Sequence, residues 1–469
     1  MSIVYELLWF FNVVIILYFL FINGTYFFLI FASFFHIRKY KDIDKVFKMT
    51  GVYSTNLYKP VSIIAPAYNE EESIINSVNS LLNLKYANFE VVVVNDGSKD
   101  NTLQLLLDYY KLEKDKRHRP KYVDHKPIRG IYTSKRYPRL IVVDKENGRK
   151  ADALNAGINI ASKELFCAVD SDSILETDVI IKMLRVFMED ESTVAVGGVI
   201  RVANGCLFRN RQIVEVRIPK TFLGRIQAVE YLRAFLFGRV GWDYLNSLLI
   251  ISGAFGVFDR KAVINAGGYL HDTVGEDMEL VMRLHDYHVK NDIPYRVRFI
   301  AEPVCWTEVP EDRRTLSVQR NRWHRGLADT LYRYRHMFFN PKYGRIGFFA
   351  MPFFLFAELL SPVIELFGYI YVAISLWLGI INLQFAILFL IASVVLGMIL
   401  SACAVLLEEL TTKRYESVTD VIILVVYAFL ENIGYRQLHA WWRLKGLIDY
   451  LKGNKEWGVM LRKGIGEDC

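Results

Sequence analysis

Short apolar runs alternate with polar loops and helical patterns through the first half of the chain. Four segments have the length and the mainly apolar or β-branched sequence of strands: residues 61–65, 89–95, 140–144 and 165–169. The last is a continuous apolar run, typical of a strand buried on both faces. Residues 74–82, between the first two runs, have apolar side chains at helical spacing. Alternation of strands and helices predicts a parallel sheet in an α/β domain.

Longer apolar stretches lie outside this region and predict membrane helices. Residues 8–35 carry no charged side chain, and basic residues follow them but do not precede them. The positive-inside rule therefore places the N-terminus outside and the following domain in the cytosol. Residues 346–382 are too long for one crossing and contain Pro362, which predicts an interfacial helix kinked into a membrane helix. Residues 384–407 predict another crossing, whereas 421–435 are either re-entrant or a second short crossing.

The composition agrees with a mixed soluble and membrane protein. Hydrophobic residues make up 53% and charged residues 23% of the 469 residues, and the mean hydropathy is +0.20. The net charge of +7 suits an anionic membrane face and anionic substrates, and it does not single out nucleic acid as a partner. We expect four segments: residues 1–45, 50–330, 331–435 and 436–469.

Two other features of the composition limit the function. The five cysteines are scattered without ligand spacing, which argues against a disulfide scaffold and a zinc site. They are Cys167, Cys206, Cys305, Cys403 and Cys469. Residues 111–139 hold eleven Lys or Arg and three acids, so we interpret them as a basic surface insertion, with an anion or membrane contact as the alternative.

Two carboxylates directly follow the last of the four predicted strands. Side chains alternate along an extended chain, so Asp170 and Asp172 can point the same way at the carboxyl end of residues 165–169. Ligands of open α/β sheets bind at that edge. Mg²⁺ or Mn²⁺ takes carboxylate oxygens and bridges to phosphates, whereas the alternative for this pair is a solvated turn.

The loops after the other strands suit a nucleotide. Glu70 and Asp96 follow the first two strands, and a carboxylate there can accept hydrogen bonds from ribose hydroxyls or a base. A plain turn at Asp96-Gly97 is the alternative. Lys150 lies near a predicted helix start and either reaches a diphosphate or is a solvated side chain.

These motifs occur in an order that resembles a known family. A-Y-N-E at 67–70, N-D-G-S at 95–98, G-R-K-A-D-A-L-N at 148–155 and D-S-D at 170–172 resemble a family 2 glycosyltransferase with the Rossmann-like α/β GT-A fold. Three further motifs extend the resemblance to the membrane-integrated hyaluronan, cellulose, chitin and poly-N-acetylglucosamine synthases. They are S-G-A-F-G-V-F at 252–258, G-E-D at 275–277 and Q-R-N-R-W at 319–323.

The resemblance implies a role for each matching residue. Asp277 is the expected catalytic base, with Glu276 beside it to support or orient. The residues expected to bind the nucleotide-sugar donor are Ala67, Tyr68, Glu70, Asp96, Lys150, Asp170, Gln319 and Arg322. Gly253 and Trp323 are expected at the acceptor, and Asp172 with Asp170 at the metal.

Three of these assignments have a structural alternative. Asp277 near a helix N-terminus can be a capping and dipole residue. Residues 319, 322 and 323 share one helical face, which can also belong to an amphipathic helix at the membrane surface. Trp457, Arg462 and Lys463 fall in a stretch similar to a nucleotide-covering gating loop, or in an amphipathic tail.

The expected function is inverting transfer of a sugar from a UDP-sugar to a growing glycan, with export by the membrane helices. The alternatives are single transfer to a polyprenyl phosphate or glycolipid, and a non-catalytic membrane scaffold. Expected partners are the UDP-sugar, a glycan or lipid-linked acceptor, the lipid bilayer and accessory export proteins. The expected location is the plasma (inner) membrane, with the catalytic domain in the cytosol.

Overall fold

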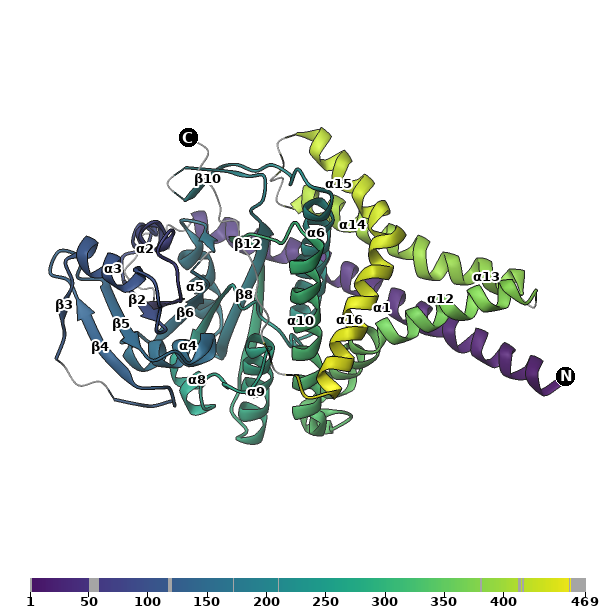
Figure 1. Ribbon diagram of the computed structural model, residues 1–469, viewed down its shortest axis with the longest axis horizontal. Helices are drawn as coiled ribbons and strands as arrows, with labels where there is room; N and C mark the ends of the chain where they lie inside the picture. The colour runs from purple at the N-terminus through teal and green to yellow at the C-terminus, as the bar shows by residue number, and fades with distance from the viewer. Residues whose placement is uncertain are drawn as a thin grey trace. The chain divides into compact units, whose positions relative to one another are not determined.

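The chain forms two compact units (Figure 1), described here from a computed structural model. The structure describes residues 2–49, 59–116, 120–171, 173–209, 211–379, 382–411, 415, 417–454 and 456. The α/β unit contains Lys39–Pro219 and Leu245–Val309. The helical unit contains Met1–Arg38, Lys220–Tyr244 and Pro310–Leu461. The predicted limits of the four sequence segments stay a prediction.

The α/β unit is built on a ten-stranded sheet with the order β3-β4-β5-β2-β1-β6-β11-β8-β12-β7. Its strands are β1 (Val61–Ala67), β2 (Phe89–Asn95), β3 (Glu113–Lys114), β4 (Ile128–Thr133), β5 (Leu140–Lys145), β6 (Leu165–Val169), β7 (Ile174–Leu175), β8 (Thr193–Val202), β11 (Phe255–Asp259) and β12 (Arg296–Thr307). A separate hairpin pairs β9 (Leu207–Arg209) with β10 (Gln212–Glu215).

The central strands confirm the predicted α/β fold. β5, β2, β1 and β6 are parallel neighbours, so residues 61–65, 91–95 and 165–169 lie side by side in one sheet. Every residue of β2, β5 and β6 is buried, including a few polar residues such as Glu90 and Asp144 among the apolar ones. The whole sheet is mixed, since β11 runs antiparallel to both β6 and β8.

Six helices accompany this sheet. They are α2 (Ile74–Leu82), α3 (Thr102–Tyr110), α4 (Arg149–Ile160), α5 (Val179–Glu189), α8 (Arg260–Asn265) and α9 (Glu276–Lys290). Helix α4 packs on β1 and β2. The approach is close at Gly157, where an added Cβ would lie 2.3 Å from Cγ2 of Ile64. This glycine therefore lets α4, which begins with Arg149 and Lys150, lie directly on the sheet.

The prediction for residues 111–139 is wrong in part. Residues 128–133 form β4, which pairs antiparallel with β5, and β3 pairs with β4 at the edge of the sheet. Within β4 only Gly130 is buried. Backbone hydrogen bonds to β5 and β3 therefore hold a strand next to the edge whose side chains give no apolar pattern.

The helical unit contains the predicted membrane helices. Its α-helices are α1 (Ser2–Met49), α6 (Phe222–Tyr231), α7 (Val240–Tyr244), α10 (Arg313–Arg333), α11 (Met351–Phe353), α12 (Ser361–Trp377), α13 (Leu383–Leu390), α14 (Leu396–Thr411), α15 (Val418–Leu430) and α16 (Arg436–Leu451). Wider π-helical turns are η2 (Leu232–Arg239), η5 (Ile346–Ala350), η6 (Phe354–Leu359), η7 (Ile391–Val395) and η8 (Glu431–Tyr435). Short 3₁₀ turns are η3 (Arg335–Met337) and η4 (Pro341–Tyr343).

Within the described residues, three helical stretches are long and apolar enough to cross a membrane: Trp9–Arg38, Leu383–Glu409 and Val418–Leu451. A fourth candidate is the pair Ile346–Leu359 and Ser361–Trp377, which is bent by 43°. This bend agrees with the kink predicted at Pro362. The segment considered at 421–435 belongs to a longer helical stretch, which breaks at Gly434 with φ +79°.

Ion pairs join two helices of this unit at regular spacing. Arg436 and Arg443 of α16 pair with Glu365 of α12 and Glu358 of η6, at 2.8 and 3.2 Å. The two arginines are seven residues apart, about two helical turns, and so are the two glutamates. The later arginine pairs with the earlier glutamate, so the segments run antiparallel. The charged residues in these apolar helices are therefore paired with one another.

Candidate active site

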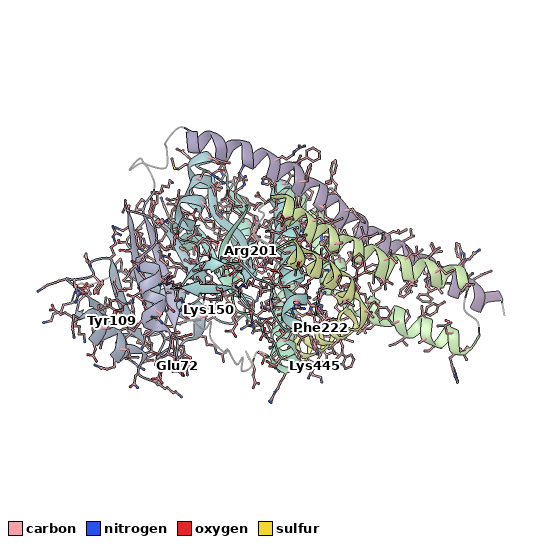
Figure 2. The ribbon with its side chains drawn as sticks, turned by 90° about the horizontal axis from the view of Figure 1, so that it is seen from above. Glu72, Tyr109, Lys150, Arg201, Phe222 and Lys445 are labelled. Atoms are coloured by element: carbon pink, nitrogen blue, oxygen red, sulfur yellow. The ribbon has the colours of Figure 1, made fainter. Side chains whose placement is uncertain are left out.

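The site lies at the carboxyl ends of the parallel strands in the α/β unit. Strand β6 is followed directly by Asp170, and β2 by Asp96. Helices α4 and α9 begin nearby and contribute Lys150, Glu276 and Asp277. Figure 2 shows Lys150 in the middle of this unit, whereas Glu72 and Tyr109 lie at its rim.

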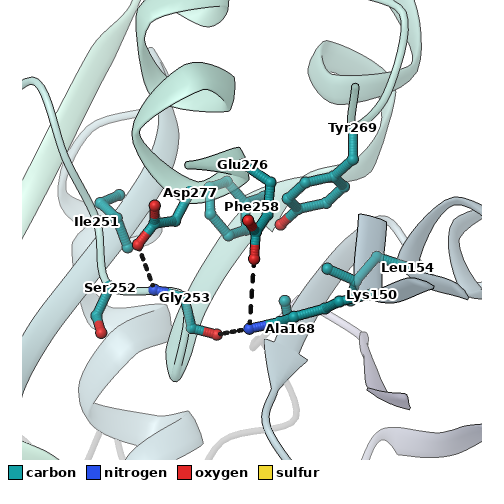
Figure 3. A pocket seen from close by; sticks show the side chains of 10 residues that line it. All are labelled: Lys150, Leu154, Ala168, Ile251, Ser252, Gly253, Phe258, Tyr269, Glu276 and Asp277. Carbon is teal, nitrogen blue, oxygen red and sulfur yellow. Dashed lines mark hydrogen bonds and ion pairs between the residues drawn. The ribbon is translucent and has the colours of Figure 1, made fainter. Parts of the chain in front are cut away.

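A small pocket brings these helix starts together with the loop before β11 (Figure 3). Its lining residues are Lys150, Leu154, Ala168, Ile251, Ser252, Gly253, Phe258, Tyr269, Glu276 and Asp277. The predicted donor-side lysine, acceptor-side glycine and catalytic carboxylates therefore share one pocket. Lys150 and Gly253 are more than 100 residues apart in the sequence, and the pairing of β6 with β11 brings them together.

Lys150 is the positive centre of the pocket. Its ammonium lies 2.5 Å from Oδ1 of Asp170 and 3.9 Å from Oε1 of Glu276, and it donates to the carbonyl of Gly253 at 2.8 Å. Burial by itself lowers the pKa of Lys150, but the carboxylates of Asp170 and Glu276 outweigh burial and raise the pKa above its ordinary value. The side chain is thus a buried, charged partner of carboxylates, and the solvated alternative for Lys150 is wrong.

Asp277 holds the acceptor-side loop from the other direction. Its Oδ2 accepts a hydrogen bond from the backbone N–H of Gly253 at 3.0 Å, as Figure 3 shows. Asp277 lies in the first turn of α9, as predicted, and the N-cap residue Gly275 makes no side-chain cap. Its carboxylate reaches from α9 to the loop at Gly253. Asp277 therefore both contacts this loop and places a negative charge at the helix N-terminus, where the helix dipole favours it.

Tyr269 is a pocket residue that the motifs did not identify. It is 5% exposed, and its hydroxyl points toward Glu276 in Figure 3. Burial, followed by the negative charges of Glu276 and Asp277, raises the pKa of Tyr269 well above its ordinary value. The phenol is therefore protonated at neutral pH and is a hydrogen-bond donor beside the carboxylates. A sequence signal is Gly267-Gly268, whose φ angles of +97° and +74° make the turn before it.

Asp96 is buried and bonded within its own region. Its carboxylate accepts from Nζ of Lys145 at 2.7 Å and from the backbone N–H groups of Gly148 and Arg149 at 3.0 and 2.8 Å. Lys145, which sequence reasoning missed, also pairs with Asp152 and is fully buried. Asp96 thus fixes the turn that leads into α4 and Lys150, and its predicted nucleotide contact stays a prediction.

The A-Y-N-E loop is tied to the segment after β6. Glu70 accepts from the hydroxyl of Ser171 at 2.8 Å, whereas the carbonyl of Ala67 accepts from the N–H of Asp96 at 2.9 Å. Tyr68 is 45% exposed. These contacts keep the donor-side loops together, and the donor roles of Ala67, Tyr68 and Glu70 stay predictions.

A second residue that the motifs did not identify reaches the segment after β6. Arg211, from the β9–β10 hairpin, donates to the hydroxyl of Ser77 at 2.6 Å. The hydroxyl of Ser77 in turn donates to the carbonyl of Ser171 at 2.8 Å. The hairpin therefore supports the loop that carries Asp170.

The predicted metal site can be tested only in part. Asp172 lies outside the described residues. Asp170 follows β6 and presents a carboxylate that is 25% exposed. Among the described residues, those around Asp170 included, no group of three His, Cys, Asp or Glu side chains is placed to hold a metal. One carboxylate suits Mg²⁺ or Mn²⁺, which bind proteins through one or two carboxylates and take further oxygens from water and phosphate.

Other predicted residues lie in the helical unit or outside the described chain. On α10, Gln319 is buried and Trp323 is 42% exposed. Arg320 pairs with Glu230 at 2.6 Å and lies over the Trp323 ring at 4.5 Å. The donor and acceptor roles of Gln319, Arg322 and Trp323 stay predictions. Trp457, Arg462 and Lys463 are outside the described residues. The gating loop therefore stays a prediction.

Comparison with known proteins agrees with the motifs. A family model described as "Glycosyl transferase family group 2" matches residues 165–404, half of the chain, and the model "Glycosyl transferase family 2" matches residues 62–263. The chain belongs to the family 2 glycosyltransferases. The resemblance expected from the ordered motifs is therefore confirmed.

Two of the curated relatives that the chain resembles are poly-beta-1,6-N-acetyl-D-glucosamine synthases. The chain is 28% identical over 273 residues to a poly-beta-1,6-N-acetyl-D-glucosamine synthase of Staphylococcus epidermidis, and 30% identical over 276 residues to that of Staphylococcus aureus strain COL. Each match covers 58% of this chain and 56% of the relative, so the chain spans about half the length of these proteins.

A solved structure shares the fold of this glycosyltransferase. The mannosyltransferase PcManGT from Pyrobaculum calidifontis, in complex with GDP-Man and Mn²⁺, matches with a TM-score of 0.50 at 17% identity. The match covers 92% of this chain and 100% of that chain. At this identity the likeness concerns the fold, and it confirms a GT-A fold with apolar helices at both ends of the chain.

Proposed function

We propose that this protein is an inverting membrane glycosyltransferase that transfers a sugar from a UDP-sugar to a growing glycan. One observation carries the proposal: the carboxylate of Asp277 and the ammonium of Lys150 lie on opposite sides of Gly253 in one pocket, and each hydrogen-bonds that residue. A general base and a cation for a departing diphosphate are thereby set next to each other.

The proposed reaction is a single displacement. Asp277 takes the proton of an acceptor hydroxyl as its oxygen forms a bond to the anomeric carbon. The bond between that carbon and the diphosphate oxygen breaks, and its electron pair leaves on UDP. One displacement inverts the configuration at the anomeric carbon. Glu276 and the Tyr269 hydroxyl orient the groups around Asp277, whereas Lys150 offsets negative charge on the diphosphate.

Donor binding is proposed for Ala67, Tyr68, Glu70, Asp96 and Asp170, with Gln319 and Arg322 from the Q-R-N-R-W motif. Gly253 and Trp323 are proposed at the acceptor. The names of the staphylococcal relatives make UDP-N-acetylglucosamine the first donor to test and a poly-N-acetylglucosamine chain the proposed product.

The membrane helices lead to a proposal for location. Three or four candidate spans support an integral membrane protein. We propose that it lies in the plasma (inner) membrane, with the N-terminus outside and the α/β unit in the cytosol, where nucleotide sugars are available. Export of the glycan through the helices and help from accessory export proteins belong to the same proposal.

A divalent metal, Mg²⁺ or Mn²⁺, is proposed at Asp170 and Asp172. When bound, it supplies neutralisation of the negative charge that develops on the departing diphosphate. The Pyrobaculum mannosyltransferase of the same fold was solved in complex with Mn²⁺. We predict that EDTA abolishes transfer and that excess Mn²⁺ restores it, measured as UDP release. Unchanged activity after chelation would contradict the metal role.

A product assay tests the proposed function. Purified protein in detergent is incubated with membrane lipids, Mn²⁺ and a panel of radiolabelled UDP-sugars, and the products are separated by size. Long polymer supports a synthase, whereas a single lipid-linked sugar supports the single-transfer enzyme. If no donor is turned over, the enzymatic proposal fails and a membrane scaffold remains.

A further inference from the structure

The pocket has more negative groups than positive ones. Glu276 and Asp277 line it together with Lys150, and Asp170 lies beside the pocket, in contact with Lys150. All three carboxylates act on the ammonium of Lys150. The closest contact, 2.5 Å to Oδ1 of Asp170, joins Lys150 to the residue proposed as a metal ligand. Lys150 therefore neutralises in this structure the charge that a divalent cation would otherwise neutralise.

This ion pair and metal binding at Asp170 exclude each other in part. A metal bound to a carboxylate oxygen lies about 2.0–2.1 Å from it in the case of Mg²⁺. An ammonium 2.5 Å from Oδ1 of Asp170 would then lie close to a doubly charged ion. The repulsion between them is strong because the two charges would be so close together. One of the two cations has to move when the other binds Asp170.

Lys150 is partly exposed and has a second hydrogen-bond partner, so it can move away from Asp170. The Lys150 side chain is 19% exposed and that of Asp170 is 25% exposed, so both can be reached from solvent. The hydrogen bond of 2.8 Å from the ammonium to the Gly253 carbonyl does not depend on Asp170. Lys150 can therefore release Asp170 and stay in the pocket, where a diphosphate would replace the lost negative partner.

We propose that Lys150 is the resident counter-ion of Asp170 and exchanges partners when the site is loaded. In the unloaded enzyme the ammonium of Lys150 forms an ion pair with the carboxylate of Asp170. In the loaded enzyme Asp170 binds the divalent metal, and Lys150 binds the diphosphate of the donor. A metal ion that binds alone has to compete with Lys150 for Asp170. When metal and nucleotide bind together, Asp170 is paired with the metal and Lys150 with the diphosphate. The inference rests on the proposed function, because it takes the metal and donor sites from it.

The test separates metal affinity from nucleotide affinity. Lys150→Met removes the competitor but also the diphosphate partner. We expect Mn²⁺ alone to bind this full-length variant at least about tenfold more tightly than wild type, because a unit positive charge next to the ligand is gone. We expect UDP affinity at saturating Mn²⁺ to fall at least about tenfold. Electron paramagnetic resonance measures free Mn²⁺, and calorimetry measures UDP binding.

The controls distinguish exchange from a permanent structural ion pair. Lys182 pairs with Asp178 at 2.8 Å on α5, does not line the pocket, and gives the same charge change in Lys182→Met. Lys182→Met should bind Mn²⁺ as wild type does, and Lys150→Arg should keep the competition and bind Mn²⁺ weakly. If Lys150→Met does not fold, Lys150→Gln, which retains a donor for the Gly253 carbonyl, has the same expected result.

Two results would overturn the inference. A folded Lys150→Met or Lys150→Gln protein with unchanged or weaker Mn²⁺ affinity shows that Lys150 does not compete for Asp170, even if the wild type transfers sugar. In that case the proposed function stands and the exchange is refuted. If wild type binds neither UDP nor Mn²⁺, the proposed function fails as well.

Discussion

Substitution of Asp277 by Asn tests the proposed base most directly. Asp277 accepts from the N–H of Gly253 with Oδ2 at 3.0 Å and from the N–H of Met278 with Oδ1 at 2.8 Å. Asn has the same shape but only one acceptor oxygen, so it can keep the contact with Gly253 and then loses the contact with Met278. It cannot take a proton from an acceptor hydroxyl. The substitution therefore removes the proposed chemistry and leaves the loop contact in place.

The substitution has separate effects on turnover and on folding. A positioned general base contributes roughly 10²–10⁴-fold to rate, which corresponds to about 2.7–5.4 kcal/mol of activation free energy. After the substitution the hydrogen bond to Gly253 is neutral rather than charge-assisted and the one to Met278 is lost, which together cost about 1–3 kcal/mol of folding free energy. Asp277→Asn is thus expected to lose nearly all turnover in a protein that stays folded.

Turnover is measured as UDP release under saturating donor, UDP affinity by calorimetry, and folding by thermal unfolding. UDP affinity should change little, because Asp277 is proposed to face the acceptor. Asp286→Asn makes the same chemical change on α9, where Asp286 pairs with Lys290 at 2.7 Å, and should keep wild-type turnover. Near-normal turnover of Asp277→Asn would falsify the base assignment and favour a capping role. Joint loss of UDP binding and turnover would move Asp277 to the donor site.

Three further substitutions test the surroundings of the site and the helices. Lys145→Met leaves two buried carboxylates without their shared cation, so we expect a loss of about 3–5 kcal/mol of unfolding free energy, seen as a lower melting temperature; an unchanged melting temperature contradicts the buried pairing. In detergent, Glu365→Gln should lower the melting temperature, and Glu365→Gln with Arg436→Gln should recover part of the loss, because the double variant has no unpaired buried charge; additive losses would refute the pairing. Burial lowers the pKa of His285 to about 4, below the ordinary value of 6.5, so the unfolded chain binds a proton between these values and stability falls as the pH drops below 6.5. The slope from this group approaches about 1.4 kcal/mol per pH unit, and urea unfolding from pH 7.5 to 5 should show a flatter dependence for His285→Gln than for wild type.

The parallel half of the sheet could be predicted because its strands are buried on both faces. Most positions of such a strand are apolar, so residues 61–65, with one serine, and 165–169, with no polar residue, are visible as short apolar runs. Strand β4 lies at the opposite extreme. It has one buried residue and is held by backbone hydrogen bonds to β5, which depend on no particular side chain. Residues 128–133 therefore left no apolar pattern to interpret.

The site could be predicted to the level of strand ends and helix starts. Asp170 and Asp277 lie where the pattern indicated, at the end of β6 and in the first turn of α9. Tyr269 was missed because it belongs to neither a strand end nor a motif, and only the turn before α9 brings it to Glu276. Lys150 and Gly253 are more than 100 residues apart in the sequence and meet because of the order of the strands in the sheet. The periodicity of a single segment does not predict that order.

Asp96 shows why correct placement does not determine a role. A carboxylate offers about four acceptor positions. In this structure four contacts from three donors use these positions: Nζ of Lys145 at the end of β5, the N–H of Gly148 to both oxygens, and the N–H of Arg149 in the turn that follows. Arg149 has φ +72°, an unfavourable value for a side chain other than glycine, and the bond to Asp96 helps to hold it. A nucleotide that binds Asp96 directly has to replace at least one of these donors. The turn that starts α4 would then move, and with it Lys150, the next residue after Arg149. The proposed contact with the nucleotide and the control of Lys150 thus belong to the same carboxylate, and the sequence motif predicts only the first.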